Sequence, residues 1–135
     1  MYIEIDKMII DDLNIIKETL ENDFDDFWNY NILKEELEND NSRYIVAKID
    51  AKIVGFAGIK IIVDEANIMN IVTKKSYRNQ GIGALLLEKL ISIAYDLHLN
   101  SISLEVSEKN PPAIHLYEKF RFQIFRYKKK LLPKQ

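Results

Sequence analysis

The sequence of 135 residues predicts a single α/β (α+β) domain, residues 1–135, by its length. We expect a mixed central sheet of about six to seven strands flanked by about four helices. Two observations carry this prediction. The first half contains several β-branched runs of strand length, and residues 68–106 read as strand, glycine loop, helix and strand. Such a crossover unit makes its two strands parallel.

The first third is expected to hold one strand and two helices. Apolar residues over positions 2–5 indicate the strand. Asp11 and Asp12 then begin a helix, because carboxylates near a helix N-terminus are stabilised by its dipole. A second helix is expected over residues 27–37. The apolar positions of the first helix are Leu13, Ile16 and Leu20.

Two β-branched runs, residues 43–49 and 53–63, are expected to pair as a hairpin. Their connection, Asp50-Ala51-Lys52, lacks the Asn-Gly pair that short hairpin turns favour. Residues 64–67 are expected to form the next turn, followed by a strand over residues 68–72.

The second half is predicted from helical and strand periodicity. Residues 81–97 have apolar side chains at helical spacing and predict the longest helix. Alternation over residues 101–106 predicts a short strand. Pro111-Pro112 suits the first turn of a helix that continues to about residue 120, and residues 122–128 predict a last strand.

The loop at residues 78–83 reads Arg-Asn-Gln-Gly-Ile-Gly and precedes the longest helix. Free N–H groups at a helix start face the positive end of the helix dipole and can bind a pyrophosphate. Gly81 and Gly83 allow a close ligand approach or a positive φ. A glycine turn without any ligand is the alternative interpretation of the loop taken alone.

The loop pattern Arg/Gln-x-x-Gly-x-Gly/Ala, with Tyr77 before it and three leucines after it, resembles the acetyl-CoA loop of the GNAT N-acetyltransferases. A second segment, Leu-Glu-Val at residues 104–106 and Ala-Ile-His-Leu-Tyr-Glu-Lys at 113–119, resembles the RimI-like branch, the ribosomal-protein-alanine N-acetyltransferases. The resemblance covers residues 43–122. It implies the GNAT fold, with the parallel strand-loop-helix-strand unit as the acetyl-CoA site.

Functional residues follow from this resemblance. In the RimI-like branch a glutamate accepts the amine proton and a tyrosine donates a proton to the leaving thiolate, which implies these roles for Glu105 and Tyr117. Taken without the resemblance, Glu105 is an exposed strand carboxylate and Tyr117 a half-buried helix residue. The residues implied in acetyl-CoA binding are Ile71, Val72, Thr73, Arg78, Asn79, Gln80, Gly81, Ile82, Gly83, Ala84 and Asn110.

Within this set, pantetheine is expected to lie along residues 71–73 as an added strand, and the N–H of Val72 to polarise the thioester carbonyl. Asn110 is expected to reach the same arm. The pyrophosphate is expected at the amides of residues 79–84.

The implied reaction is transfer of acetyl from acetyl-CoA to a primary amine. The resemblance to the RimI-like branch implies a protein N-terminus as the acceptor, and an α-amino group with a pKa of about 8 asks less of a base than a lysine at about 10.4. Two alternatives stay open: acetylation of a small amine such as a polyamine or aminoglycoside, and a non-catalytic CoA-binding module.

The composition of the chain restricts the metals, nucleic acids and membranes expected as partners. The chain has no cysteine and two histidines, so no metal site is expected. A net charge of −2 argues against DNA, and no signal peptide or membrane segment is indicated, so a cytoplasmic protein is expected. Residues 1–42 carry 13 acidic and 3 basic side chains; this acidic part either is a solvated surface or favours a cationic acceptor.

Two features depart from the family pattern. Arg121 stands where the family has a glycine that ends the helix in a left-handed cap. Only 13 residues follow Phe122. The closing strand is therefore missing, or residues 128–132 supply a stub of it, or a partner chain such as a second copy in a homodimer covers the edge.

Overall fold

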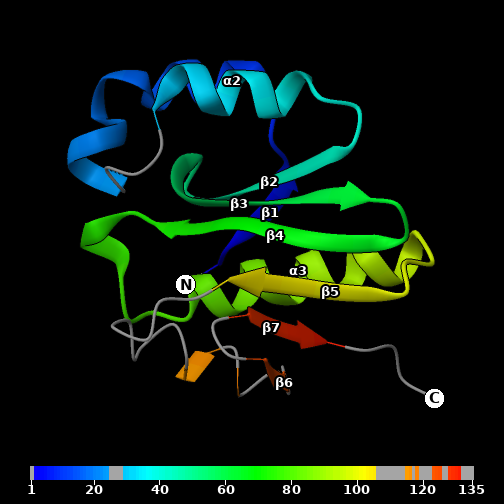
Figure 1. Ribbon diagram of the computed structural model, residues 1–135. Coiled ribbons are helices and arrows are strands. Elements are labelled where there is room, and N and C mark those ends of the chain that lie inside the picture. Colours follow the sequence, from blue (N-terminus) through cyan, green and yellow to red (C-terminus); the bar gives the residue numbers. More distant parts are fainter. Residues whose placement is uncertain are drawn as a thin grey trace.

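The computed structural model describes residues 2–24, 29–105, 115, 116, 118, 123–125 and 128–131. Within these residues the backbone forms one seven-stranded sheet with helices on both faces (Figure 1). The predicted fold class is confirmed. The spatial order of the strands is β1 (Glu4–Lys7), β2 (Ser42–Ile49), β3 (Lys52–Ile62), β4 (Glu65–Thr73), β5 (Ser101–Glu105), β7 (Lys128–Leu131) and β6 (Gln123–Phe125).

The first helix, α1 (Ile10–Ile16), is held at its start by Asp12. The Asp12 carboxylate accepts a hydrogen bond from the Ile9 amide at 2.9 Å and forms an ion pair with Lys48 of β2 at 3.2 Å. The helical path then continues as a 3-10 turn, Lys17–Thr19, and a π-helical turn, Leu20–Phe24. The predicted helix is confirmed, and Leu20 is buried as expected.

The second helix, α2 (Tyr30–Glu38), begins three residues later than predicted. The reason is Asn29, whose side-chain oxygen accepts a hydrogen bond from the Ile32 amide at 2.9 Å and caps the helix. Residues 27 and 28 lie outside the described residues.

Both hairpin loops contain two residues, which corrects the predicted turns. Ile49 pairs with Lys52, so Asp50 and Ala51 alone form the first loop, with φ values of 51° and 66°. Ile62 pairs with Glu65, so the predicted turn over residues 64–67 is wrong from Glu65 onwards. Glu65 is held in the sheet because its carboxylate accepts hydrogen bonds from the hydroxyls of two serines of β5, Ser101 at 2.9 Å and Ser103.

The crossover from β4 through α3 (Ile82–Asp96) to β5 is parallel, as predicted. Figure 1 shows α2 on one face of the sheet and α3 on the other. Each face has its own core. The core on the α3 side contains Ala57, Ile59, Leu86 and Leu90. The core on the α1 and α2 side contains Leu13, Phe24, Leu33 and Phe56.

The carboxyl-terminal strands differ from the prediction of one strand over residues 122–128. The described backbone has two short strands, and β7 lies between β5 and β6 and pairs antiparallel with both. The prediction that residues 128–132 supply a stub of a closing strand is thus confirmed, and a missing strand is wrong.

Of the helix predicted from residue 111 to about 120, the structure describes residues 115, 116 and 118, which are helical; Arg121 lies outside the described residues. Among the described helices, none is long and apolar enough to cross a membrane.

Candidate functional site

The loop before α3 presents a row of free backbone amides. In the described part of the chain, none of the N–H groups of residues 79–84 donates a hydrogen bond, and the first helical bond of α3 runs from the Leu85 amide to the Gly81 carbonyl. Such amides lie at the positive end of the helix dipole. The loop can therefore accept an anion through main-chain groups, as the sequence predicts.

The backbone of this loop turns through two left-handed residues, Asn79 with φ 64° and Gly81 with φ 82°. Gly81 is the residue that precedes α3, and no heavy atom lies within 4 Å of where its Cβ would be. Glycine is therefore needed at position 81 for its backbone conformation. Gly83 lies in the first turn of the helix, where its Cβ would make only ordinary contacts, 3.7 Å to Leu116 and 3.9 Å to Ile71 and Thr73.

Arg78 is the first residue of the loop. Its guanidinium donates a hydrogen bond to the carbonyl of Phe24 at 3.4 Å, which ties the loop to the end of the π-helical turn. A role of Arg78 in binding acetyl-CoA stays a prediction.

The edge of β4 is open next to the loop. The β4–β5 pairs run only from Glu65 and Ser101 to Ile68 and Leu104, whereas β4 stays paired with β3 as far as Thr73. Beyond Ile68, the β5 side of β4 has no strand partner among the described residues. Residues 71–73 can therefore bind an extended ligand as a further strand, as the sequence predicts.

The two catalytic candidates are described to different extents. Glu105 ends β5, and its backbone pairs with Lys128 of β7. Tyr117 and Asn110 lie outside the described residues. The residue before Tyr117, Leu116, packs against the α3 core and lies close to Gly83, which brings this part of the chain to the start of α3.

Two buried polar side chains were not predicted as functional. Tyr44 is 4% exposed and Asn70 8%, and neither the Tyr44 hydroxyl nor either polar atom of Asn70 has a hydrogen-bond partner in the described structure. Tyr44 and Asn70 flank Gly58 in one row across β2, β3 and β4. Burial, and then the Glu36 carboxylate, raise the pKa of Tyr44. The available signal was a polar asparagine between two apolar residues of the strand, Met69 and Ile71.

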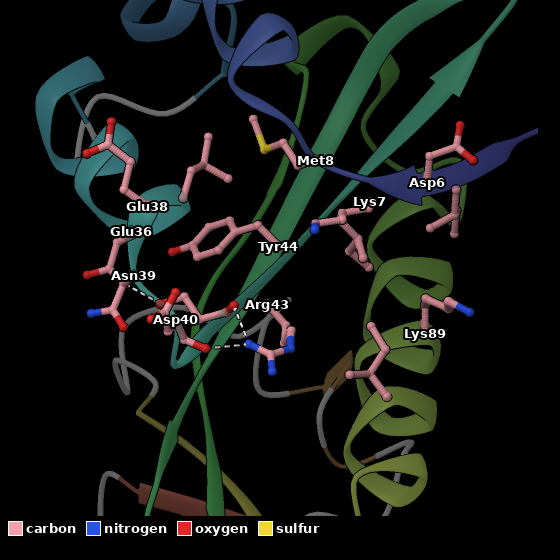
Figure 2. Close-up of a pocket in the computed structure, with 15 residues that line it drawn as sticks. Asp6, Lys7, Met8, Glu36, Glu38, Asn39, Asp40, Arg43, Tyr44 and Lys89 are labelled. Atoms are coloured by element: carbon pink, nitrogen blue, oxygen red, sulfur yellow. Dashed lines mark hydrogen bonds between the residues drawn. The ribbon is translucent and has the colours of Figure 1, made fainter.

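A cavity of about 740 Å³ lies elsewhere, between β1, the end of α2, the start of β2 and α3. Figure 2 shows Tyr44 directed toward the end of α2, and Arg43 bonded to the carbonyls of Asp40 at 2.7 Å and Ser42 at 2.9 Å. None of the residues predicted to bind acetyl-CoA lines this cavity. The charges that line it are mixed, whereas the loop before α3 presents main-chain amides suited to an anion.

A mixed sheet in which the edge of β4 has no partner among the described residues beside an amide-lined loop suits an extended anionic ligand, such as the cofactor of an acyl-transferring enzyme. The family model of the acetyltransferase (GNAT) family matches residues 10–122, so the chain belongs to the GNAT acetyltransferase family. The predicted family and fold are confirmed.

Relatives with a named activity are more specific than the family match. The chain is 37% identical over 94 residues to the ribosomal protein bS18-alanine N-acetyltransferase of Haemophilus influenzae, covering 68% of this chain and 64% of the relative. It is 37% identical over 73 residues to the enzyme of that name from Escherichia coli K12, covering 54% of this chain and 49% of the relative. The matches thus span about half to two thirds of these relatives.

Solved structures agree in fold over the whole chain. The ribosomal-protein-S18-alanine N-acetyltransferase of Escherichia coli superimposes with a TM-score of 0.89 at 23% identity, covering 99% of this chain and 96% of that one. The PaiA N-acetyltransferase of Thermoplasma acidophilum, solved in complex with coenzyme A, superimposes with a TM-score of 0.83 at 21% identity, covering 98% and 100%.

Proposed function

We propose that this protein is a cytoplasmic N-acetyltransferase that transfers acetyl from acetyl-CoA to the α-amino terminus of a protein, of the ribosomal-protein-alanine type. One observation carries the proposal: six consecutive amides, residues 79–84, without acceptors in the described chain, lie beside an open edge of β4. The family match and the names of the relatives support the same activity.

Acetyl-CoA would supply the acetyl group as a thioester. The amides of residues 79–84 would hold its pyrophosphate, and residues 71–73 would bind the pantetheine arm by main-chain hydrogen bonds. The expected role of the Val72 N–H in polarising the carbonyl does not hold, because this amide points toward its ladder partner Phe56 of β3, whereas the main-chain groups of Ile71 and Thr73 face the open edge. Asn110 would contact the same arm. These groups together would fix the reacting carbon next to the end of β4.

Glu105 would accept the proton that the acceptor amine loses, directly or through water, as its new C–N bond forms. Tyr117 would donate a proton to the departing sulfur as the C–S bond breaks. Glu105 ends a strand adjacent to β4, and Leu116, the residue before Tyr117 in the sequence, packs near Gly83; these two positions support the proposed roles.

An α-amino group is a suitable acceptor for a site with a single carboxylate base. Its pKa of about 8 leaves a useful fraction of free amine at neutral pH, whereas a lysine side chain at about 10.4 needs more help from a base. The acidic helices α1 and α2 cover the face of the sheet from which a cationic N-terminus would approach.

The test is an assay with purified protein, acetyl-CoA and a peptide that begins with alanine. Mass spectrometry should show one acetyl group per peptide, and free thiol should appear at the same rate. The same peptide with a blocked N-terminus is the control and should not react. Acetylation of a polyamine but not of any peptide would instead establish the small-amine alternative, and CoA binding without turnover would establish a non-catalytic module.

A further inference from the structure

Asn70 is a buried carboxamide whose polar atoms lack partners in the described structure. It is 8% exposed, and neither Oδ1 nor Nδ2 has a hydrogen bond. Asn67, on the same strand, has hydrogen bonds at both polar atoms. Its Nδ2 donates to the carbonyl of Lys60 at 3.4 Å, and its Oδ1 accepts from the Ser103 hydroxyl at 3.0 Å. Buried polar groups in folded proteins are nearly always bonded, so the free atoms of Asn70 indicate a ligand.

The position of Asn70 relates it to the proposed reaction. It comes after Ile68, where the β4–β5 pairs end, and two residues before Val72. Side chains two apart on a strand share a face, and Val72 packs with the core under α1 and α2. Asn70 therefore faces the helices on the acceptor side of the sheet, about 6.6 Å along the strand from Val72, at roughly 3.3 Å per residue.

We propose that Asn70 recognises the main chain of the acceptor peptide at its second residue. Oδ1 accepts a hydrogen bond from the N–H of that residue, and Nδ2 donates one to its carbonyl. In an extended chain the N–H and C=O of one residue point to the same side, as sheet pairing requires, and a carboxamide offers one acceptor and one donor to match. The inference rests on the proposed function, because it names the acceptor of that same site.

The spacing along β4 is consistent with this assignment. When the α-amino nitrogen lies beside an acetyl carbonyl level with Val72 along the strand, the second residue of the acceptor follows about one residue length behind it, roughly 3.5 Å. A hydrogen bond of about 3 Å then covers most of the remaining distance to Asn70. A simple amine without a peptide group has nothing to offer this carboxamide. Asn70 would thus select peptides over simple amines.

Tyr44 supports the same interpretation from the far side of Gly58. A Cβ at Gly58 would lie 2.3 Å from Tyr44 Cζ, so the ring extends from β2 across to β3. The hydroxyl also has no partner among the described residues. The Tyr44 hydroxyl and the two polar atoms of Asn70 thus lack hydrogen-bond partners among the described residues, and they lie in one cross-strand row on the acceptor face. Such a row can bond several polar groups of a peptide main chain.

The first experiment uses the wild-type protein, so that it does not depend on the folding of a variant. Acetylation is compared between an alanine-first peptide and an analogue in which the N–H of the second residue is replaced by an ester oxygen. We expect kcat/KM to fall at least about tenfold for the ester, since a site built to bond an N–H rejects the analogue that lacks it. Equal values for the two acceptors would overturn the assignment.

The second experiment uses Asn70→Leu, which keeps the shape and removes the polar atoms. The variant should raise KM for the peptide about tenfold or more and no longer distinguish peptide from ester. Asn67→Leu is the matched control and should alter stability without changing the ratio of peptide to ester rates. An Asn70→Leu protein with the wild-type ratio would contradict the role, whereas a wild-type protein inactive on every peptide would overturn the proposed function itself.

Discussion

The ring of Tyr44 lies directly on the backbone of Gly58, and a Cβ atom at residue 58 would be 2.3 Å from Tyr44 Cζ and 2.4 Å from both Cε atoms. Only a residue without a side chain fits beneath the ring. The contact joins β2 to β3 on the side of the sheet that α1 and α2 cover. It fixes the position of the Tyr44 ring in the cross-strand row that also contains Asn70.

Gly58→Ala should destabilise the protein. The new Cβ forces the Tyr44 ring to move within a packed core, and overpacking of this kind costs about 1–3 kcal/mol. Urea unfolding measures the change. The control is Gly83→Ala, whose Cβ would meet neighbours only at 3.7 Å or more and should raise the stability of α3 by about 0.5–1 kcal/mol. Equal effects of the two substitutions would show that the ring contact is unimportant.

Tyr44→Phe should change how stability depends on pH. The pKa of Tyr44 is raised in the folded protein by burial and by Glu36. Below about pH 10 the phenol is neutral in both states and contributes no pH dependence. Above this value the unfolded phenol ionises first, so the wild type loses stability as pH rises, by roughly 1 kcal/mol at about half a pH unit above the unfolded pKa.

The measurement is urea unfolding of wild type and Tyr44→Phe at neutral pH and at about pH 10.5. The variant should lose less stability between the two, since all other tyrosines are common to both proteins. Parallel losses would mean that the Tyr44 phenol titrates alike in the folded and unfolded chains.

Gly81→Ala should weaken coenzyme A binding. Gly81 has φ 82° at the start of α3, a conformation that costs an alanine about 1–2 kcal/mol. The loop amides would then shift from their common direction. Gly81→Asn is the control, because asparagine tolerates the left-handed region and should retain more of the affinity. Titration calorimetry gives both affinities, and an alanine variant that binds as tightly as wild type would exclude the loop as the diphosphate site.

Tyr117→Phe should lower kcat on an alanine-first peptide about 10²-fold or more with little change in acetyl-CoA affinity. The phenol proton is lost from the reaction while the ring is kept, and general acid catalysis contributes on this scale. Steady-state kinetics and calorimetry on the same preparation separate the two quantities. A normal kcat would remove Tyr117 from the proton-donor role.

Much of this fold could be predicted because its signals are local. The helical spacing of Leu86 and Leu90 predicted α3, and its position between two strands predicted the parallel pairing of β4 with β5. The loop at residues 78–83 was recognisable because a glycine cluster before a helix has few other uses. These features depend on short-range geometry, which a single sequence contains.

The features that sequence could not supply are long-range. Asp64 and Asn67 predict a turn that would include Glu65, because Asp and Asn favour turns, yet hydrogen bonds from β5 serines keep Glu65 in β4. The position of β7 between β5 and β6 depends on pairing with a strand far earlier in the chain. The sequence also cannot show that the polar atoms of Asn70 lack hydrogen-bond partners, because those partners are decided only when the strands assemble.

The parallel pairing of β4 with β5 also sets a kinetic requirement. Glu65 and Ser101 meet although 36 positions separate them, so the chain must close a long loop before that pairing contributes any stability. Helix α3 occupies 15 of the intervening residues and forms from local contacts. Folding speed should therefore follow the intrinsic helicity of α3, and substitutions on its exposed surface should change the refolding rate more than the unfolding rate.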